Sequence, residues 1–538
     1  MHKNRFIIYC LSLLTLFFLC WSPPETKAQE NTSQATSQTG LSEAGVLKVG
    51  MEANYAPFNW TQGQKRDGAW PIANASGEYA NGYDLQMAKK LADQLDLKLE
   101  IYKIDWDALP VALEAGKIDA VIAGMSPTAE REKRLDFSDS YYHSDIVIVT
   151  LADSPYSQAK QLKDLKGAKL TGQLNTFHYE LLDQVPGVEE VPAMQDFPTM
   201  ISAVTSGKID GYISERPGAL AAVAANSDLT LVEFNEGEGF DLGKLTTDVA
   251  IAVRKNSPLR PAINDQLAKI PGPEREDLME DMVVLNERGE SLGFWSEVRG
   301  IWTDFGGQFL KGAANTMLIA LSSTLLGFLL GLAIAIFRSI PDPKNSLKKV
   351  VYAAINLLIT VYIEIFRGTP MMVQAMLIFY GSKLFLNWDM STMFAAIFIV
   401  SINTGAYLSE VIRGGIMGVD SGQQEAAQAI GMNHFQQMTT IILPQAIRQI
   451  LPALGNEFVI NIKDTSVLNV IAVTELFFVT RSTAGSTYLT FQTFFITSII
   501  YFVLTFTTTR LLHLLEKHLT GSKHYRVHTS STMADQPE

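Results

Sequence analysis

The feature that most constrains the fold is an uncharged apolar run in the second half of the chain. Residues 317–337 contain no Asp, Glu, Lys or Arg. About 21 residues span roughly 30 Å as an α-helix, which is the thickness of the hydrocarbon core of a bilayer. Four more apolar stretches follow, at about 353–380, 393–408, 451–479 and 489–512. The chain is therefore predicted to cross a membrane about five times.

The distribution of basic residues predicts the orientation of these spans. Lys and Arg follow the first span, at Arg338, Lys344, Lys348 and Lys349, and occur again near the end of the chain, at Lys517, Lys523 and Arg526. Cytoplasmic loops are enriched in Lys and Arg. An odd number of spans places the first half outside the cell and the C-terminus in the cytoplasm. Five spans are therefore favoured over four or six.

The first residues have the composition of exported proteins. Residues 1–28 have a basic start, an apolar run and a small residue at the end, as in a secretory signal peptide. Residues 29–45 are rich in Ser, Thr, Gln and Gly, which predicts a flexible tether. Both cysteines, Cys10 and Cys20, lie in the predicted signal. The mature chain is expected to depend on packing alone, without a disulfide.

Strand-like and helix-like patterns alternate over residues 46–288. Residues 47–51 are typical of a strand, residues 85–95 place apolar side chains on one face of a helix, and residues 119–123 fit a buried parallel strand. This alternation predicts an α/β domain with helices covering a mainly parallel sheet.

One segment of this domain occurs twice. Residues 112–124 (ALEAGKIDAVIAG) recur as residues 203–215 (AVTSGKIDGYISE). In each copy a helix is predicted to end at Gly and a strand to begin at Lys-Ile-Asp, so Gly124 and Glu215 follow equivalent strands. Ligands of open α/β sheets bind at the carboxyl ends of strands. The repeat therefore predicts two lobes, the second at about 152–247, that line one cleft.

A more specific motif lies between the third and fourth predicted spans. Glu425, Ala426, Ala427, Gly431 and Pro444 stand in the order E-A-A-x3-G-x9-I-x-L-P. This segment resembles the coupling loop of bacterial importer permeases that are powered by ATP-binding cassettes. The surrounding sequence, from Asn315 to Glu516, resembles the permeases for polar amino acids.

That resemblance implies a permease and a partner. It makes residues 300–520 an all-α transmembrane permease domain, residues 425–444 the loop that docks on an ATPase, and residues 521–538 a cytoplasmic tail. The phosphate-binding pattern G-x4-G-K-[ST] does not occur in the sequence. Two copies of a separate ATP-binding subunit are therefore expected to drive a homodimer of this chain, and no enzymatic activity is expected of the chain itself.

The first half resembles the extracellular binding proteins of the same importers. The resemblance rests on residues 122–131 (IAGMSPTAER) and residues 136–142 (DFSDSYY). It implies a bilobed α/β domain of the type II periplasmic-binding-protein kind. By motif position it implies two sets of ligand-binding residues: Arg131, Ser126 and Thr176 for the carboxylate, and Gly124 and Glu215 for the ammonium. An arginine can hold a carboxylate through two parallel charge-assisted hydrogen bonds.

The same resemblance implies a pocket for the ligand side chain. Five residues are expected to line it: Glu52, Tyr55, Phe58, Trp60 and Trp106. Aromatic walls with one acid suit an amide, or a cation held by cation–π attraction and charge pairing. Glutamine and a basic amino acid both remain open. Residues 61–81 are expected to form a long loop near this pocket, with no assigned role.

Together these features predict ATP-driven import of an amino acid by a multi-pass protein of the cell membrane. The alternative is a ligand-gated channel or a transmembrane sensor that uses the same bilobed domain. No metal and no cofactor are expected. The net charge of −13 argues against nucleic acid as a partner.

Overall fold

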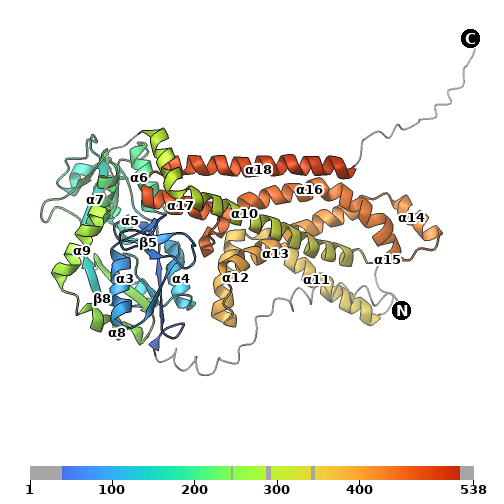
Figure 1. The fold of residues 1–538 in the computed structure, drawn as a ribbon, viewed down its shortest axis with the longest axis horizontal. Coiled ribbons are helices and arrows are strands. Elements are labelled where there is room, and N and C mark those ends of the chain that lie inside the picture. The colour runs from blue at the N-terminus through green and yellow to red at the C-terminus, as the bar shows by residue number, and fades with distance from the viewer. Residues whose placement is uncertain (1–38, 244–245, 286–292, 341–345, 521–538) are drawn as a thin grey trace, which may run out of the picture.

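The structure is a computed structural model of an elongated molecule, with an α/β domain at one end and a bundle of long helices extending from it (Figure 1). It describes four ranges: residues 39–243, 246–285, 293–340 and 346–520. The predicted signal peptide, most of the predicted tether and the predicted tail lie outside these residues.

The first lobe of the α/β domain is built on a five-stranded mixed sheet. In sheet order its strands are β6 (Lys98–Lys103), β1 (Val46–Met51), β7 (Ala120–Val121), β14 (Asp248–Arg254) and β8 (Leu135–His143). The helices of this lobe are α3 (Tyr83–Gln94), α4 (Leu109–Glu114) and α8 (Leu259–Leu267). Strand side chains such as Val49, Ile101 and Val121 are fully buried and form its core.

The second lobe has a sheet of the same design. Its strands, in sheet order, are β11 (Glu189–Glu190), β10 (Lys169–Thr171), β12 (Gly211–Glu215), β9 (Ile146–Leu151) and β13 (Leu229–Val232). The helices of this lobe are α5 (Phe177–Glu180), α6 (Phe197–Thr205) and α7 (Arg216–Ala225). The lobe begins at β9, a few residues before the predicted start at about 152.

Both sheets are mixed, whereas a mainly parallel sheet was expected. The chain passes directly from β8 in the first lobe to β9 in the second, and it returns through β14. β9 and β14 therefore pair antiparallel with β12 and β7. Antiparallel neighbours need no helical crossover, so these two passages form a short double hinge.

The repeated segment has the same structural role in both lobes. The backbone N–H of Lys48 donates to Asp119 Oδ2 at 3.2 Å, and that of Lys169 donates to Asp210 Oδ2 at 2.7 Å. The strand register also matches, with Val49 opposite Ala120 and Leu170 opposite Gly211. The repeat therefore marks two equivalent strand pairs.

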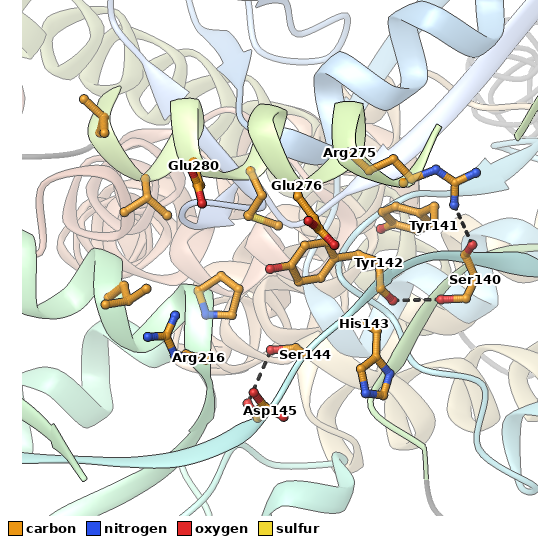
Figure 2. Close-up of a pocket in the computed structure, with 16 residues that line it drawn as sticks. Ser140, Tyr141, Tyr142, His143, Ser144, Asp145, Arg216, Arg275, Glu276 and Glu280 are labelled. Carbon is orange, nitrogen blue, oxygen red and sulfur yellow. Dashed lines mark hydrogen bonds between the residues drawn. The ribbon is translucent and has the colours of Figure 1, made fainter. Parts of the chain in front are cut away.

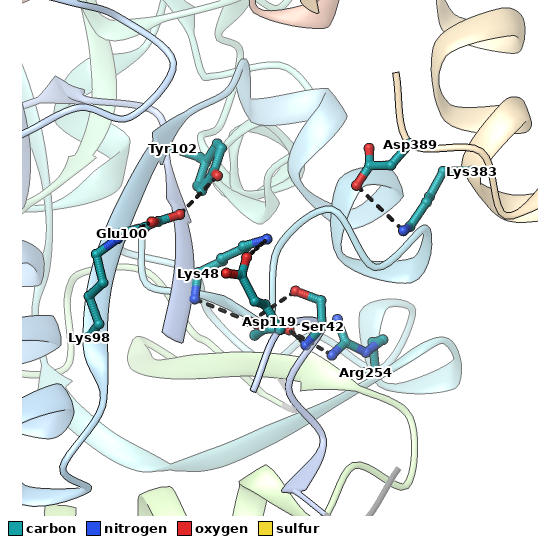
Figure 3. Close-up of polar contacts among 10 residues, drawn as sticks. Ser42, Lys48, Lys98, Glu100, Tyr102, Asp119, Arg254, Lys383 and Asp389 are labelled. Carbon is teal, nitrogen blue, oxygen red and sulfur yellow. Dashed lines mark hydrogen bonds and ion pairs between the residues drawn. The ribbon is translucent and has the colours of Figure 1, made fainter. Parts of the chain in front are cut away.

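Asp119 also fixes the end of the predicted tether (Figure 3). Arg254 Nη2 donates to Asp119 Oδ1 at 2.9 Å and to the Gly40 carbonyl at 2.5 Å. The N–H of Ser42 donates to Asp119 Oδ1 at 2.6 Å, and Leu41 is buried. The expectation that the tether runs to residue 45 is therefore wrong, because residues 40–42 are packed against the first lobe.

The insertion at residues 61–81 forms strands, so the expectation of a long loop is wrong. A small antiparallel sheet contains, in order, β2 (Asn54–Tyr55), β3 (Asn59–Gln62), β5 (Tyr79–Asn81) and β4 (Trp70–Pro71). Trp60 and Thr61 in β3 and Ala80 in β5 are buried. Burial of these side chains stabilises strands that the Gly and Asn content did not predict.

The rest of the described chain is helical. Its elements are α9 (Gly272–Leu285), α10 (Phe294–Arg338), α11 (Ser346–Gly368), α12 (Met371–Leu386), α13 (Thr392–Met417), α14 (Ser421–Ala429), α15 (His434–Gln437), α16 (Leu443–Asp464), α17 (Leu476–Thr487) and α18 (Thr490–Thr520). Among the described residues, α10, α11, α13 and α18 are long and apolar enough to cross a membrane.

Two of the five predicted spans are interrupted. Residues 353–380 divide into α11 and α12 at Pro370, because the residue before a proline is disfavoured in helical geometry. Residues 451–479 divide into α16 and α17 through the 3₁₀ segment Thr465–Ile471. α16 has 22 residues, but Arg448 and Glu457 make it less apolar than the four helices above.

Small residues allow α10 and α13 to pack closely. A Cβ atom at Gly327 would lie 2.7 Å from Thr404 Cγ2, and one at Gly331 would lie 2.8 Å from the Ser409 nitrogen. Glycines four residues apart are a common contact surface between membrane helices. This contact ties the first long helix to the helix that leads into α14.

Candidate functional site between the two lobes

A small pocket lies where the two lobes face each other. The first lobe contributes Glu52, Tyr55, Trp106, Gly124, Ser126 and Arg131, and the second contributes Gln173, Thr176, Phe177, His178, Phe197 and Glu215. These residues follow the carboxyl ends of β1, β7, β10 and β12, or lie close to them. The pocket therefore occupies the place where open α/β sheets bind ligands.

Eight of the predicted ligand residues line this pocket, and two do not. Phe58 is fully buried behind Tyr55, with ring centroids 5.1 Å apart. Trp60 is buried within β3. Sequence reasoning missed four lining residues: Gln173, Phe177, His178 and Phe197. The first three lie next to Thr176 in the sequence and could have been included with it, whereas no motif marks Phe197.

Arg131 connects the two lobes at the edge of the pocket. Its Nη1 donates to the Ser126 carbonyl at 2.9 Å, and its Nη2 donates to the Asn175 carbonyl of the second lobe at 3.1 Å. Its guanidinium lies 5.1 Å from the ring centroid of Trp106. Burial lowers the pKa of Arg131 to about 10, so the side chain is charged at neutral pH. Only two of its five N–H groups are used by these carbonyls.

Glu215 is a buried carboxylate held from both lobes. The Tyr55 hydroxyl, from the first lobe, donates to Glu215 Oε2, and His178 Nε2 lies 3.0 Å from Oε1. Burial raises the pKa of Glu215, but His178 and the hydrogen bond from Tyr55 outweigh it and hold the pKa below its ordinary value. Tyr55 also stacks on Phe197 at 4.3 Å, so aromatic packing closes the pocket.

Glu52 has the opposite electrostatic character. Its side chain is buried at the end of β1. Burial raises the pKa of Glu52 to about 8; Asp196 raises it further, and Arg481 lowers it. Glu52 therefore favours its protonated form at neutral pH, and a cation bound beside it would favour its ionisation.

A buried aspartate supports two segments that line the pocket. Asp84 accepts hydrogen bonds from the Tyr141 hydroxyl at 2.6 Å and from Asn59 Nδ2 at 2.7 Å. Tyr141 in turn accepts from the N–H of Gly124 at 3.3 Å, and Asn59 Oδ1 accepts from the N–H of Ala53 at 2.7 Å. Burial raises the pKa of Asp84 to about 7. This network therefore fixes the backbone at Ala53 and at Gly124, the two segments that it contacts near Tyr55.

A wider hollow lies at the hinge, between α9 and residues 140–145 (Figure 2). Its two arginines have other partners, because Arg275 Nη1 donates to the Ser140 carbonyl at 3.0 Å and Arg216 pairs with Glu233 at 2.9 Å. None of the predicted ligand residues lines it. Its walls belong to the hinge and to both lobes.

The predicted coupling residues lie at the other end of the molecule. Figure 1 shows α14 and α15 at the end of the helical domain that is farthest from the α/β domain. Glu425 and Ala426 are exposed on α14, whereas Ala427 is buried. Gly431, at φ +81°, follows the helix, and Pro444 lies in the first turn of α16. Ile430, at the C-terminal end of α14, is 77% exposed.

Two family comparisons define the class of protein. Residues 47–275 match the bacterial extracellular solute-binding proteins of family 3. Residues 350–521 match the inner membrane component of binding-protein-dependent transport systems. The chain thus joins a solute-binding domain to a transport permease, as the sequence predicted.

Individual relatives narrow this class. Over the helical half, the chain is 36% identical to the nopaline permease NocM of Agrobacterium fabrum, covering 41% of this chain and 91% of that protein. It is 30% identical to the arginine permease ArtQ of Bacillus subtilis (39% and 91% covered) and 32% identical to the putative glutamine permease GlnP of Rickettsia felis (39% and 92% covered). The chain belongs to the family of amino-acid ABC transporter permeases and carries a solute-binding domain fused to its permease domain.

A solved structure is also similar to the first half. It is an amino-acid ABC transporter substrate-binding protein from Streptococcus pneumoniae, bound to L-arginine. It is 26% identical, with a TM-score of 0.39, and the match covers 45% of this chain and 94% of that one.

Proposed function

We propose that this chain binds a basic amino acid outside the cell and carries it across the membrane with energy from a separate ATP-hydrolysing subunit. The observation that carries the choice of a basic ligand is Glu52, a buried acid that faces the pocket beside Trp106. Burial favours the neutral form of this carboxyl even though Arg481 lies near enough to lower its pKa, and a cationic ligand side chain would add a further countercharge. Arginine is the reference ligand, and the name of the relative ArtQ is consistent with it.

The zwitterionic part of the ligand has partners of both signs. Arg131, with Ser126 and Thr176, would hold the carboxylate, and Glu215, with the Gly124 carbonyl, would hold the ammonium. The ligand side chain would then extend along Trp106 towards Glu52. Phe58 and Trp60 have no direct ligand contact in this proposal, because both are buried within the first lobe.

The proposed orientation in the membrane is supported by the positions of the α/β domain and α14 at opposite ends of the molecule (Figure 1). The binding domain lies outside the cell, so α14, at the far end, lies in the cytoplasm. There Glu425, Ala426 and Ala427 would contact the ATP-hydrolysing subunit. α11 is largely exposed in the single chain, and its apolar surface is suited to lipid or to a second copy. The assembly would contain two copies of this chain and two ATP-hydrolysing subunits.

The dependence of affinity on pH tests the ligand class. Glu52 is neutral below a pKa of about 8, and a bound cation requires its charged form, so binding releases one proton. The affinity for arginine should therefore rise about tenfold per pH unit between pH 6 and pH 7.5. Calorimetry on the full-length chain in nanodiscs measures this slope.

Two comparisons make the pH test decisive. Glutamine carries no side-chain charge and should show little slope, and Glu52→Gln should abolish the slope for arginine. Tight, pH-independent binding of glutamine with weak binding of arginine would instead assign the pocket to an amide ligand. Absence of binding by both amino acids would contradict the proposed pocket.

A further inference from the structure

The contact between the two-lobed domain and the helical domain is made mainly by the first lobe. The insertion at residues 61–81 accepts five of the hydrogen bonds that cross this contact. Gln308 Nε2, on α10, donates to the carbonyls of Gly63 and Gly77 at 3.0 and 3.3 Å. Thr474 Oγ1 donates to the Asn74 carbonyl at 2.5 Å. The insertion, which has no assigned role from sequence, is therefore a docking surface for the helical domain.

α17 completes this docking surface at close range. A Cβ atom at Gly485 would lie 2.3 Å from the Cβ of Asn54 and 3.0 Å from its Cα. Ser482 Oγ donates to Glu78 Oε2 at 2.8 Å, and both side chains are buried. Lys103 Nζ lies 5.2 Å from the ring centroid of Phe478. The first lobe is thus held rigidly against α17.

The second lobe has fewer polar ties to the helical domain than the first, although α6 also packs against α17 and α18. Its polar contacts with that domain include an ion pair between Asp196 and Arg481 and a long hydrogen bond of 3.4 Å from Thr490 Oγ1 to the Pro198 carbonyl. A hollow separates the ends of α6 and α7 from the beginning of α10 and α18. The second lobe therefore has room to move while the first stays docked.

Arg481 of α17 contacts both lobes at once. Its Nη1 donates to Asp105 Oδ2 in the first lobe at 3.0 Å, and its Nη2 donates to Asp196 Oδ2 in the second lobe at 2.7 Å. Its side chain is 12% exposed. Asp105 immediately precedes Trp106, and Asp196 immediately precedes Phe197, so each carboxylate is adjacent to an aromatic wall of the pocket.

We propose that Arg481 is a latch that holds the two lobes closed while the binding domain is docked. One guanidinium can bond to both carboxylates only when closure brings them to the same side chain. Asp105 is fixed with the first lobe, so the energetic effect of the latch falls on the second lobe. Displacement of α17 during transport would break the bond to Asp196 and let the second lobe open. This inference rests on the proposed function, since it assumes that the ligand binds between the lobes.

The latch has a consequence for ligand affinity. A bond that exists only in the closed state stabilises that state, and the closed state is the one that retains the ligand. Loss of one buried charge-assisted pair should therefore weaken ligand binding by at least about tenfold. Arg481 is a positioning residue in this account, because it acts on the ligand through the two lobes.

Fluorescence energy transfer between the lobes tests the latch in the full-length chain in nanodiscs. Dyes are attached to cysteines at two exposed positions, Lys98 in the first lobe and Glu236 in the second, with Cys10 and Cys20 changed to serine. The variants are Arg481→Gln and Asp196→Asn. Asn also caps helices well, so the second variant keeps the start of α6 intact where Asp196 accepts from the N–H of Thr199 at 3.0 Å.

The matched control is Lys311→Gln, because Lys311 donates to the Ser76 carbonyl of the first lobe, at 3.0 Å, and also lies near Glu78 of the same lobe. With saturating arginine, or glutamine where that binds more tightly, both latch variants should show a smaller closed fraction and at least about tenfold weaker binding. The control should remain within about twofold of wild type. If either latch variant folds and shows the same closed fraction and the same ligand affinity as wild type, the proposed latch is wrong. If neither arginine nor glutamine closes the lobes of the wild-type chain, the proposed function is wrong instead.

Discussion

Replacing Arg131 with alanine is expected to weaken amino-acid binding by about 10³-fold. A carboxylate held by a bidentate arginine loses two charge-assisted hydrogen bonds, each contributing about 1.5–3 kcal/mol, and roughly 1.4 kcal/mol corresponds to a factor of ten. The side chain also joins the lobes through the Ser126 and Asn175 carbonyls. Calorimetry on the full-length chain measures the change.

Arg134→Ala is the matched control for Arg131→Ala. Arg134 lies three residues away but is exposed, and it pairs with Glu114 at 2.5 Å on the surface of the first lobe. Its loss should change ligand affinity by less than about twofold, because exposed pairs contribute little. Unchanged affinity in Arg131→Ala would show that the carboxylate is held elsewhere.

Reversing the charge of Glu425 is expected to uncouple transport while leaving ligand binding intact. Glu425 and Ala426 are exposed on α14, and Ile430 is exposed at its C-terminal end. A charge reversal at the centre of a docking surface typically costs 2 kcal/mol or more, so Glu425→Arg should weaken association of the ATP-hydrolysing subunit by about 30-fold or more. Co-purification and uptake assays measure the two effects.

The matched control for Glu425→Arg is the same charge reversal at Glu516 on α18. Figure 1 places the end of α18 towards the same end of the helical domain as α14. Glu516→Arg should leave association of the ATP-hydrolysing subunit unchanged. Full association of the Glu425→Arg chain would contradict the role assigned to α14.

Features that depend on local sequence were predictable. The repeat of Gly-Lys-Ile-Asp correctly indicated two equivalent strand pairs, because Asp119 and Asp210 each accept a hydrogen bond from a backbone N–H of a neighbouring strand. Pro370 interrupts one predicted span, and the proline itself was visible in the sequence. Its effect was missed because the apolar run continues on both sides of it.

Features that depend on distant partners were not predictable. Residues 40–42 are fixed by Arg254, more than 200 residues away. The insertion at residues 61–81 is bonded to α10 and α17, which no local pattern in its sequence indicates. Phe197 lines the pocket because it stacks on Tyr55 of the first lobe at 4.3 Å. In each case the deciding contact is a tertiary one.

Uptake into proteoliposomes tests the central claim most directly. The full-length chain is reconstituted with and without its ATP-hydrolysing subunit, and entry of radiolabelled arginine is followed with and without ATP. Accumulation above the external concentration is expected only with both the subunit and ATP, and Arg131→Ala should abolish it. Passive equilibration of arginine through the chain alone, or accumulation without ATP, would contradict the account.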